Sequence, residues 1–111
     1  TVRKAEVTVP YSKIKLGIAE ILVREGYLAK VEKSEDGRQL FLTLKYINKT
    51  PAVHGITRIS KPGNRCYVGK DKIKEVLNGF GIAIISTPRG LMTDTEAKAA
   101  QVGGELICQV Y

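Results

Sequence analysis

Residues 6–26 read EVTVPYSKIKLGIAEILVREG and place a short strand directly before a helix. Val7 and Val9 alternate with polar residues, which is typical of a half-buried strand. Ser12 is a good N-cap, and apolar residues then recur with the spacing of one helix face. Those residues are Ile14, Ile18, Ile21 and Leu22. The stretch predicts a strand followed by a helix that stops at Gly26.

Two alternating stretches follow this helix and flank the dipeptide Asp36-Gly37. Because both residues tolerate positive φ, the dipeptide favours a hairpin with a tight type I′ turn. The second stretch carries one apolar face, made of Leu40, Leu42, Leu44 and Tyr46. Strand, helix and hairpin together predict an N-terminal α+β domain over residues 1–47. A polar, proline-broken segment over residues 48–52 is expected to be a linker.

The remaining residues, 53–111, predict a second small domain that is mainly β. The segments with the pattern of short strands are 53–59, 66–68, 82–85 and 106–110. Two brief helices are expected between them. One has an apolar stripe made of Ile73, Val76 and Leu77. The other begins with the capping box of Thr93 and Glu96 and is expected to end at Gly103. The predicted fold class is therefore α+β with two small domains.

The composition limits the kinds of protein this chain can be. Its 111 residues are 43% hydrophobic and 26% charged, which suits small folded domains and excludes a large multidomain enzyme. The net charge of +7 favours a polyanionic partner such as nucleic acid. Cys66 and Cys108 lack metal-ligand spacing and are expected to be small buried residues. Since neither a membrane span nor a signal peptide is recognisable, we expect a cytoplasmic protein without a membrane partner.

No set of residues has the spacing of a catalytic, metal or cofactor site. His54, the only histidine, has no carboxylate or cysteine at a recognisable spacing. Asp94 and Glu96 are expected to cap a helix rather than to act as acid and base. Gly79-Phe80-Gly81 lacks the third glycine of a dinucleotide fingerprint and is expected to reverse the chain. We therefore expect no enzyme activity, no cofactor, no metal and no small-molecule substrate.

Positive charge is concentrated between positions 58 and 74, where six basic residues accompany the single acid Asp71. The basic residues are Arg58, Lys61, Arg65, Lys70, Lys72 and Lys74. Pro62 and Gly63 predict a rigid turn that presents Lys61 and Arg65 to phosphate groups. A solvated loop and surface helix is the alternative interpretation of these charges.

The segment over residues 86–94 leaves a buried strand, turns through proline and glycine, and enters the capped helix. We expect a loop anchored at both ends. Its two hydroxyls and one guanidinium suit hydrogen bonds to phosphates and ribose 2′-hydroxyls in the minor groove of RNA. The candidate contacts are Ser86, Thr87, Pro88, Arg89 and Gly90. An ordinary loop without a ligand is the alternative.

The run from Ser86 to Asp94, followed by Val102-Gly103-Gly104-Glu105, resembles the C-terminal signature of the small ribosomal subunit protein eight family. Further matches are Val9-Pro10, Ser12-Lys13, Glu25-Gly26-Tyr27, residues 42–46, residues 58–63 with Arg65 and Tyr67, and residues 81–83. Such ordered agreement over nearly the whole chain is specific, whereas each motif alone is weak.

The resemblance implies a two-domain α+β protein of the cytoplasmic ribosome that binds the central domain of 16S rRNA. It also implies a role in small-subunit assembly and contacts with neighbouring small-subunit proteins. In that family the serine-threonine loop and the glycine-glycine-glutamate turn meet the RNA minor groove. Those positions are Ser86, Thr87, Pro88, Gly103, Gly104 and Glu105. Tyr67 is implied as a lesser contact. The basic residues Arg58, Lys61 and Arg65, with Lys13 at the start of the first helix, complete the predicted RNA-binding set.

The sequence departs from the family pattern at two places. The family usually has serine at the position of Pro88, so one hydroxyl is missing here. The family also begins with a helix that is absent ahead of Thr1, so we expect an incomplete or trimmed chain. Two interpretations of Glu105 stay open: contact with RNA or orientation of a basic side chain, and a structural carboxylate that bonds backbone N–H groups.

Two other functions compete with a ribosomal role. A translational regulator could bind messenger RNA with the same surface. A nucleic-acid-processing enzyme is the second rival, but the sequence offers it no catalytic residues.

Overall fold

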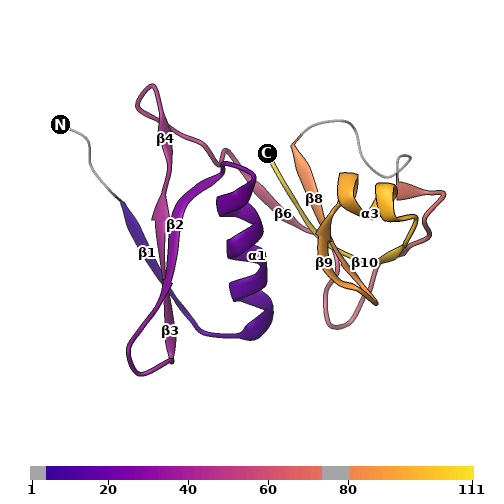
Figure 1. Ribbon diagram of the computed structural model, residues 1–111, viewed down its shortest axis with the longest axis horizontal. Coiled ribbons are helices and arrows are strands. Elements are labelled where there is room, and N and C mark those ends of the chain that lie inside the picture. The colour runs from indigo at the N-terminus through magenta and orange to yellow at the C-terminus, as the bar shows by residue number, and fades with distance from the viewer. Residues whose placement is uncertain (1–4, 74–80) are drawn as a thin grey trace. The chain divides into compact units, whose positions relative to one another are not determined.

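The computed structural model describes residues 5–73 and 81–111 and divides into two compact units, Thr1–Val53 and His54–Tyr111 (Figure 1). Both units combine helix with antiparallel sheet. The predicted α+β fold class is therefore confirmed.

The first unit is a three-stranded antiparallel sheet with one helix beside it (Figure 1). Its strands are β1 (Glu6–Pro10), β2 (Leu28–Lys33) and β3 (Gln39–Leu44), in the order β1-β3-β2. The helix is α1 (Lys13–Arg24). The buried residues that join helix and sheet are Ala19, Ile21, Leu22, Leu28 and Leu40. The predicted strand, helix and hairpin are thus all present.

Local signals explain both ends of α1. The Ser12 hydroxyl accepts a hydrogen bond from the Lys15 backbone N–H at 3.1 Å, as the predicted N-cap should. Gly26 adopts a φ of +86°, which lets the chain turn away after the helix. The buried stripe differs from the prediction at one end. Ile21 is 4% exposed, but Ile14 lies two turns earlier, in the first turn of the helix, and stays 47% exposed.

The hairpin between β2 and β3 has a wider turn than the predicted type I′ turn. Its closing backbone bond runs from Ser34 N–H to the Gln39 carbonyl at 2.9 Å. Within this turn only Gly37 has a positive φ, at +74°. The Asp36 carboxylate instead accepts hydrogen bonds from the Ser34 hydroxyl at 2.6 Å and the Arg38 N–H at 3.0 Å. These side-chain bonds stabilise the longer loop.

The segment expected to be a linker forms a small hairpin. Its strands are β4 (Tyr46–Ile47) and β5 (Thr50–Pro51). Asn48 and Lys49 make the turn with φ values of +51° and +68°. Positive φ at both central residues is what a type I′ turn requires, and asparagine accepts it readily. This hairpin belongs to the first unit.

Strand β10 (Gly104–Val110) is the centre of the second unit. It pairs with β8 (Ile82–Thr87) along one edge and with β6 (Ile56–Arg58) and β7 (Tyr67–Val68) along the other. Strand β9 (Gly90–Thr93) extends the sheet beyond β8, so the order is β6-β10-β8-β9. All these pairings are antiparallel.

The expected loop over residues 86–94 is instead a hairpin of β8 and β9. Thr87 pairs with Gly90, so Pro88 and Arg89 form the turn between them. Proline is tolerated there because a turn position needs no N–H for the sheet. Leu91 pairs with Ser86, which continues the sheet where the sequence suggested a loop.

Helix α3 (Asp94–Ala100) carries the predicted capping box. The Thr93 hydroxyl accepts from the Glu96 N–H at 3.1 Å, and the Glu96 carboxylate accepts from the Thr93 N–H at 3.0 Å. Asp94 accepts from the Ala83 N–H at 2.9 Å and so links the helix to β8. The helix ends at Gln101 in the left-handed conformation, not at the expected Gly103.

The helix predicted over Ile73, Val76 and Leu77 and the turn predicted at Gly79-Phe80-Gly81 lie outside the described residues, apart from Ile73 and Gly81. In the described part of the chain, no helix is long and apolar enough to cross a membrane.

The core of the second unit lies between the sheet and α3. It consists of Val68, Ile73, Ala83, Ile85, Ala97 and Leu106. Cys108 of β10 is buried and has a free thiol, as expected, whereas Cys66 is only half-buried. Burial raises the pKa of the Cys108 thiol.

Two glycines, the first residue of β10 and the residue before it, let the chain approach the neighbouring strands closely. A Cβ atom on Gly104 would collide with the Ser86 carbonyl oxygen of β8. A Cβ atom on Gly103 would collide with the Val68 carbonyl oxygen of β7. Because both obstacles are backbone atoms, a side chain at either position would push the strands apart.

Replacing Ile21 with aspartate should destabilise the first unit by about 3 kcal/mol or more, because it buries an unpaired charge against the sheet. The matched control is Ile14→Asp, which places the same charge in the exposed first turn of the same helix and should cost less than about 1 kcal/mol. Denaturant unfolding measures both. Equal losses of stability would contradict the packing described for α1.

Replacing Gly104 with alanine should destabilise the second unit by about 1 to 3 kcal/mol, because the new methyl group overlaps the Ser86 carbonyl. Gly63→Ala is the control, since a Cβ there meets no atom within 4 Å and φ is not in the left-handed region. Thermal unfolding compares the two variants. A Gly104→Ala protein as stable as the control would show that the strands do not need this close contact.

Candidate nucleic-acid interface

Three strands of the second unit bring predicted contact residues into one row. Glu105 of β10 pairs with Tyr67 of β7 on one side and with Ser86 of β8 on the other. Directly paired residues point to the same face of a sheet, so these three side chains are neighbours. The next residue, Leu106, points to the opposite face and enters the core. The row Tyr67–Glu105–Ser86 is therefore formed by strand register.

The two outer members of this row suit RNA in different ways. Tyr67 is 72% exposed, so its ring is accessible for stacking on a base. Ser86 is half-buried, and its hydroxyl makes no hydrogen bond to another described residue. A hydroxyl of this kind can both donate to and accept from ribose and phosphate oxygens.

Glu105, the central member, is engaged by neighbouring side chains. Its Oε2 accepts a hydrogen bond from the Ser60 hydroxyl at 2.6 Å and forms an ion pair with Arg65 Nη1 at 3.0 Å. The Ser60 hydroxyl in turn accepts from the Cys66 backbone N–H at 3.0 Å. The bond from Ser60, and then Arg65, lowers the pKa of Glu105. This geometry favours the interpretation in which Glu105 orients a basic side chain.

The predicted rigid turn lies beside this row. Lys61 and Asn64 exchange two backbone hydrogen bonds, at 3.1 and 2.9 Å, with Pro62 and Gly63 between them. Arg58 of β6 supports the start of the turn by donating its Nε–H to the Ser60 carbonyl at 3.1 Å. The turn therefore presents Lys61 and Arg65 from a closed backbone frame.

The β8–β9 hairpin offers fewer accessible hydroxyl groups to a ligand than the sequence suggested. Thr87 is 8% exposed and donates its hydroxyl proton to the Gly90 carbonyl at 2.8 Å. The Thr87 hydroxyl oxygen also accepts a hydrogen bond from the Arg89 N–H at 3.0 Å. The Thr87 hydroxyl therefore holds the turn together, while Pro88 and Arg89 are exposed at the tip.

The structure brings most of the predicted set together within the second unit. Gly103 and Gly104 provide the close backbone approach beneath the row, and Lys13 is the first residue of α1 in the first unit. Ser60 was not among the predicted contacts. Its signals in the sequence were its place directly before the basic turn and its position within the family match over residues 58–63.

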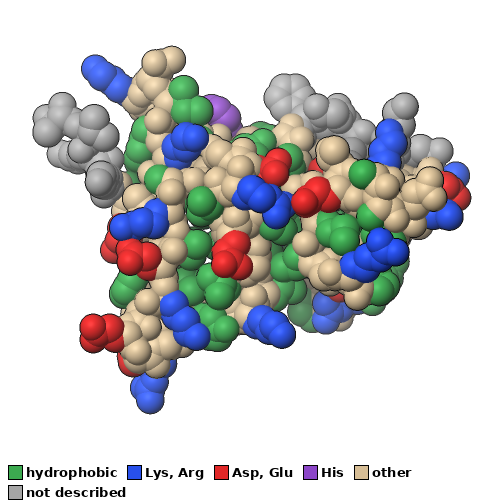
Figure 2. Space-filling model, in the orientation of Figure 1, with side chains coloured by type: hydrophobic (Ala, Val, Ile, Leu, Met, Phe, Trp, Pro, Cys, Tyr) green, Lys and Arg blue, Asp and Glu red, His purple; other side chains and the backbone are tan. Residues whose placement is uncertain are grey.

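Charge is spread over the surface as well as grouped at this turn. On the face drawn in Figure 2, Lys and Arg side chains are scattered among Asp and Glu side chains and form no single large patch. Local groups such as Lys61 with Arg65 are therefore more informative about a binding surface than the net charge.

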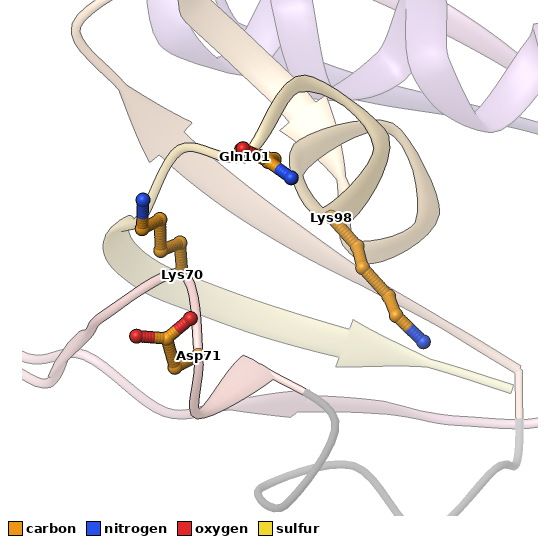
Figure 3. Close-up of a pocket in the computed structure, with 4 residues that line it drawn as sticks. All are labelled: Lys70, Asp71, Lys98 and Gln101. Carbon is orange, nitrogen blue, oxygen red and sulfur yellow. The ribbon is translucent and has the colours of Figure 1, made fainter.

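A hollow of about 330 Å³ is also found in the second unit. Among the described residues, Lys70, Asp71, Lys98 and Gln101 line it. Figure 3 shows that the Lys70 and Lys98 side chains extend away from each other, so their ammonium groups do not converge on one anion. Among the residues that the structure describes, no group of three or more His, Cys, Asp or Glu side chains could hold a metal ion.

Comparison with known proteins identifies the family of this chain. The family described as Ribosomal protein S8 matches residues 1–111. A small ribosomal subunit protein uS8 from Dictyoglomus turgidum is 52% identical over 111 residues, which cover 98% of this chain and 85% of the relative. The protein of the same name from Paracidovorax citrulli is 47% identical with the same coverage. The one from Persephonella marina is 47% identical over 117 residues, covering 98% and 86%. The resemblance is confirmed, and the chain belongs to the ribosomal protein S8 family.

Proposed function

We propose that the second unit binds ribosomal RNA directly and that the row Tyr67–Glu105–Ser86 with its basic turn is the binding surface. Membership of the family makes the chain a ribosomal protein of the small subunit, within the cytoplasmic ribosome. The RNA in this proposal is the central domain of 16S rRNA, and binding supports assembly of the subunit. The role is structural and non-catalytic, beside neighbouring small-subunit proteins.

The observation that carries this proposal is the cross-strand row itself. The register of β7, β10 and β8 sets an exposed aromatic ring, a carboxylate with its arginine, and a serine hydroxyl side by side. An arginine held by Glu105 and an exposed aromatic ring on the strand paired with it offer phosphate binding and base stacking on one surface. The hydroxyl adds the means to recognise a 2′-hydroxyl, which distinguishes RNA from DNA.

Crosslinking of the protein to RNA inside isolated small subunits, followed by mapping of the crosslinked nucleotides, tests the proposed target. Crosslinks from Tyr67 to the central domain of 16S rRNA are expected. Crosslinks confined to another rRNA domain, or none from the second unit, would contradict the proposal.

Replacing Lys61 and Arg65 with glutamine should weaken binding to the rRNA fragment and lower the slope of log affinity against log salt by up to about two, roughly one for each phosphate that is no longer neutralised. Lys45→Gln with Lys49→Gln is the control, because it removes two exposed charges from the first unit. Salt titrations of all three proteins make the comparison. If both double variants lowered the salt slope equally, the turn would contribute only through its net charge.

Replacing Ser86 with alanine should reduce the preference for the rRNA fragment over an unrelated RNA duplex about two- to tenfold, because one hydrogen bond of about 0.5 to 1.5 kcal/mol is removed. The salt slope should not change, since the charge stays the same. Thr95→Ala, which removes an exposed hydroxyl from α3, is the control and should bind as the unmodified protein does. Full preference retained in the Ser86 variant would remove this hydroxyl from the recognition surface.

A further inference from the structure

Ser60 is a buried hydroxyl placed between the basic turn and β10. It is 3% exposed, and its oxygen takes part in two hydrogen bonds with partners on different segments. It donates to Glu105 Oε2 at 2.6 Å and accepts from the Cys66 N–H at 3.0 Å. Since Ser60 precedes the turn and Cys66 follows it, one hydroxyl fastens both ends of the turn to β10.

The Glu105 carboxylate, which Ser60 holds in place, also holds Arg65. The same oxygen, Oε2, receives both the Ser60 hydroxyl and Arg65 Nη1. The Glu105 side chain is 17% exposed, whereas the Arg65 side chain is 53% exposed. A guanidinium carries five N–H donors, so the ion pair leaves donors of Arg65 for another acceptor. A side chain already held in place also loses less rotamer entropy on binding.

We propose that Ser60 and Glu105 are positioning residues that act on RNA through Arg65, whose guanidinium contacts a phosphate. This inference rests on the proposed function, because it needs RNA at the same surface. It accounts for a carboxylate on a surface proposed to meet a polyanion, because the phosphates would repel an unpaired carboxylate. The contribution of Glu105 is therefore the orientation of Arg65, and Ser60 fixes Glu105.

Double-mutant cycles test this chain of action. Affinity for the rRNA fragment is measured at equal ionic strength for the unmodified protein, Ser60→Ala, Arg65→Gln and the double variant. Ser60→Ala alone should lower affinity about three- to tenfold, the range expected for one hydrogen bond. In the Arg65→Gln background the same change should have little further effect. The control cycle combines Ser60→Ala with Arg89→Gln, on the separate β8–β9 hairpin, and should be additive.

A second cycle uses Glu105→Gln with Arg65→Gln and decides the matter if Ser60→Ala fails to unfold cooperatively in a thermal scan. Glu105→Gln should weaken binding although it removes a negative charge, and the loss should vanish without Arg65. Tighter binding would mean that Glu105 merely repels RNA, and additive losses would mean that it contacts RNA itself. Either result overturns the inference and leaves the proposed function intact. An unmodified protein with no preference for the rRNA fragment would overturn both.

Discussion

The close approach of β10 to β7 and β8 is the constraint on which the second unit depends. At Gly103 and Gly104 backbone carbonyls occupy the space that a side chain would fill, so strand spacing and register are fixed together. That register places Tyr67, Glu105 and Ser86 in one row. It also brings Glu105 within hydrogen-bond distance of Ser60, at the start of the basic turn. The glycines of the family signature therefore have a steric role in this chain, separate from any contact with RNA.

Local signals were sufficient to predict both described helices. A hydroxyl cap and a repeating apolar stripe act within a few residues, which is why Ser12 and the Thr93 box were interpreted correctly. Turn types were harder, because neighbouring side chains choose among them. Asp36 bonds to Ser34 and so stabilises a wider loop, while the turn with two positive φ values occurs at residues 48–49. Strand β9 was missed because it is short and begins directly after the two-residue turn of Pro88 and Arg89.

The chemistry of the candidate surface was visible in the sequence, but its arrangement was not. Arg65, Tyr67 and Glu105 were each singled out, yet their contact depends on pairing between segments about 40 positions apart. The direction of a hydroxyl cannot be deduced from its residue type. Thr87 uses its proton within the hairpin, and the partner of Ser60 is 45 residues away. Residue types indicated nucleic acid, and only the register showed which side chains lie side by side.

The buried thiol of Cys108 gives β10 a chemical reporter of its own. Only the thiolate reacts with alkylating reagents, and both the burial and the raised pKa of Cys108 oppose its formation. Labelling therefore requires the strand to open, so the labelling rate measures how often β10 separates from its neighbours. The half-buried Cys66 is more accessible to the reagent. Its labelling rate therefore shows whether slow labelling of Cys108 comes from a slow reagent or from rare opening of the strand. A time course of mass spectra then follows the opening of the central strand of this sheet, without any cysteine being introduced by mutation.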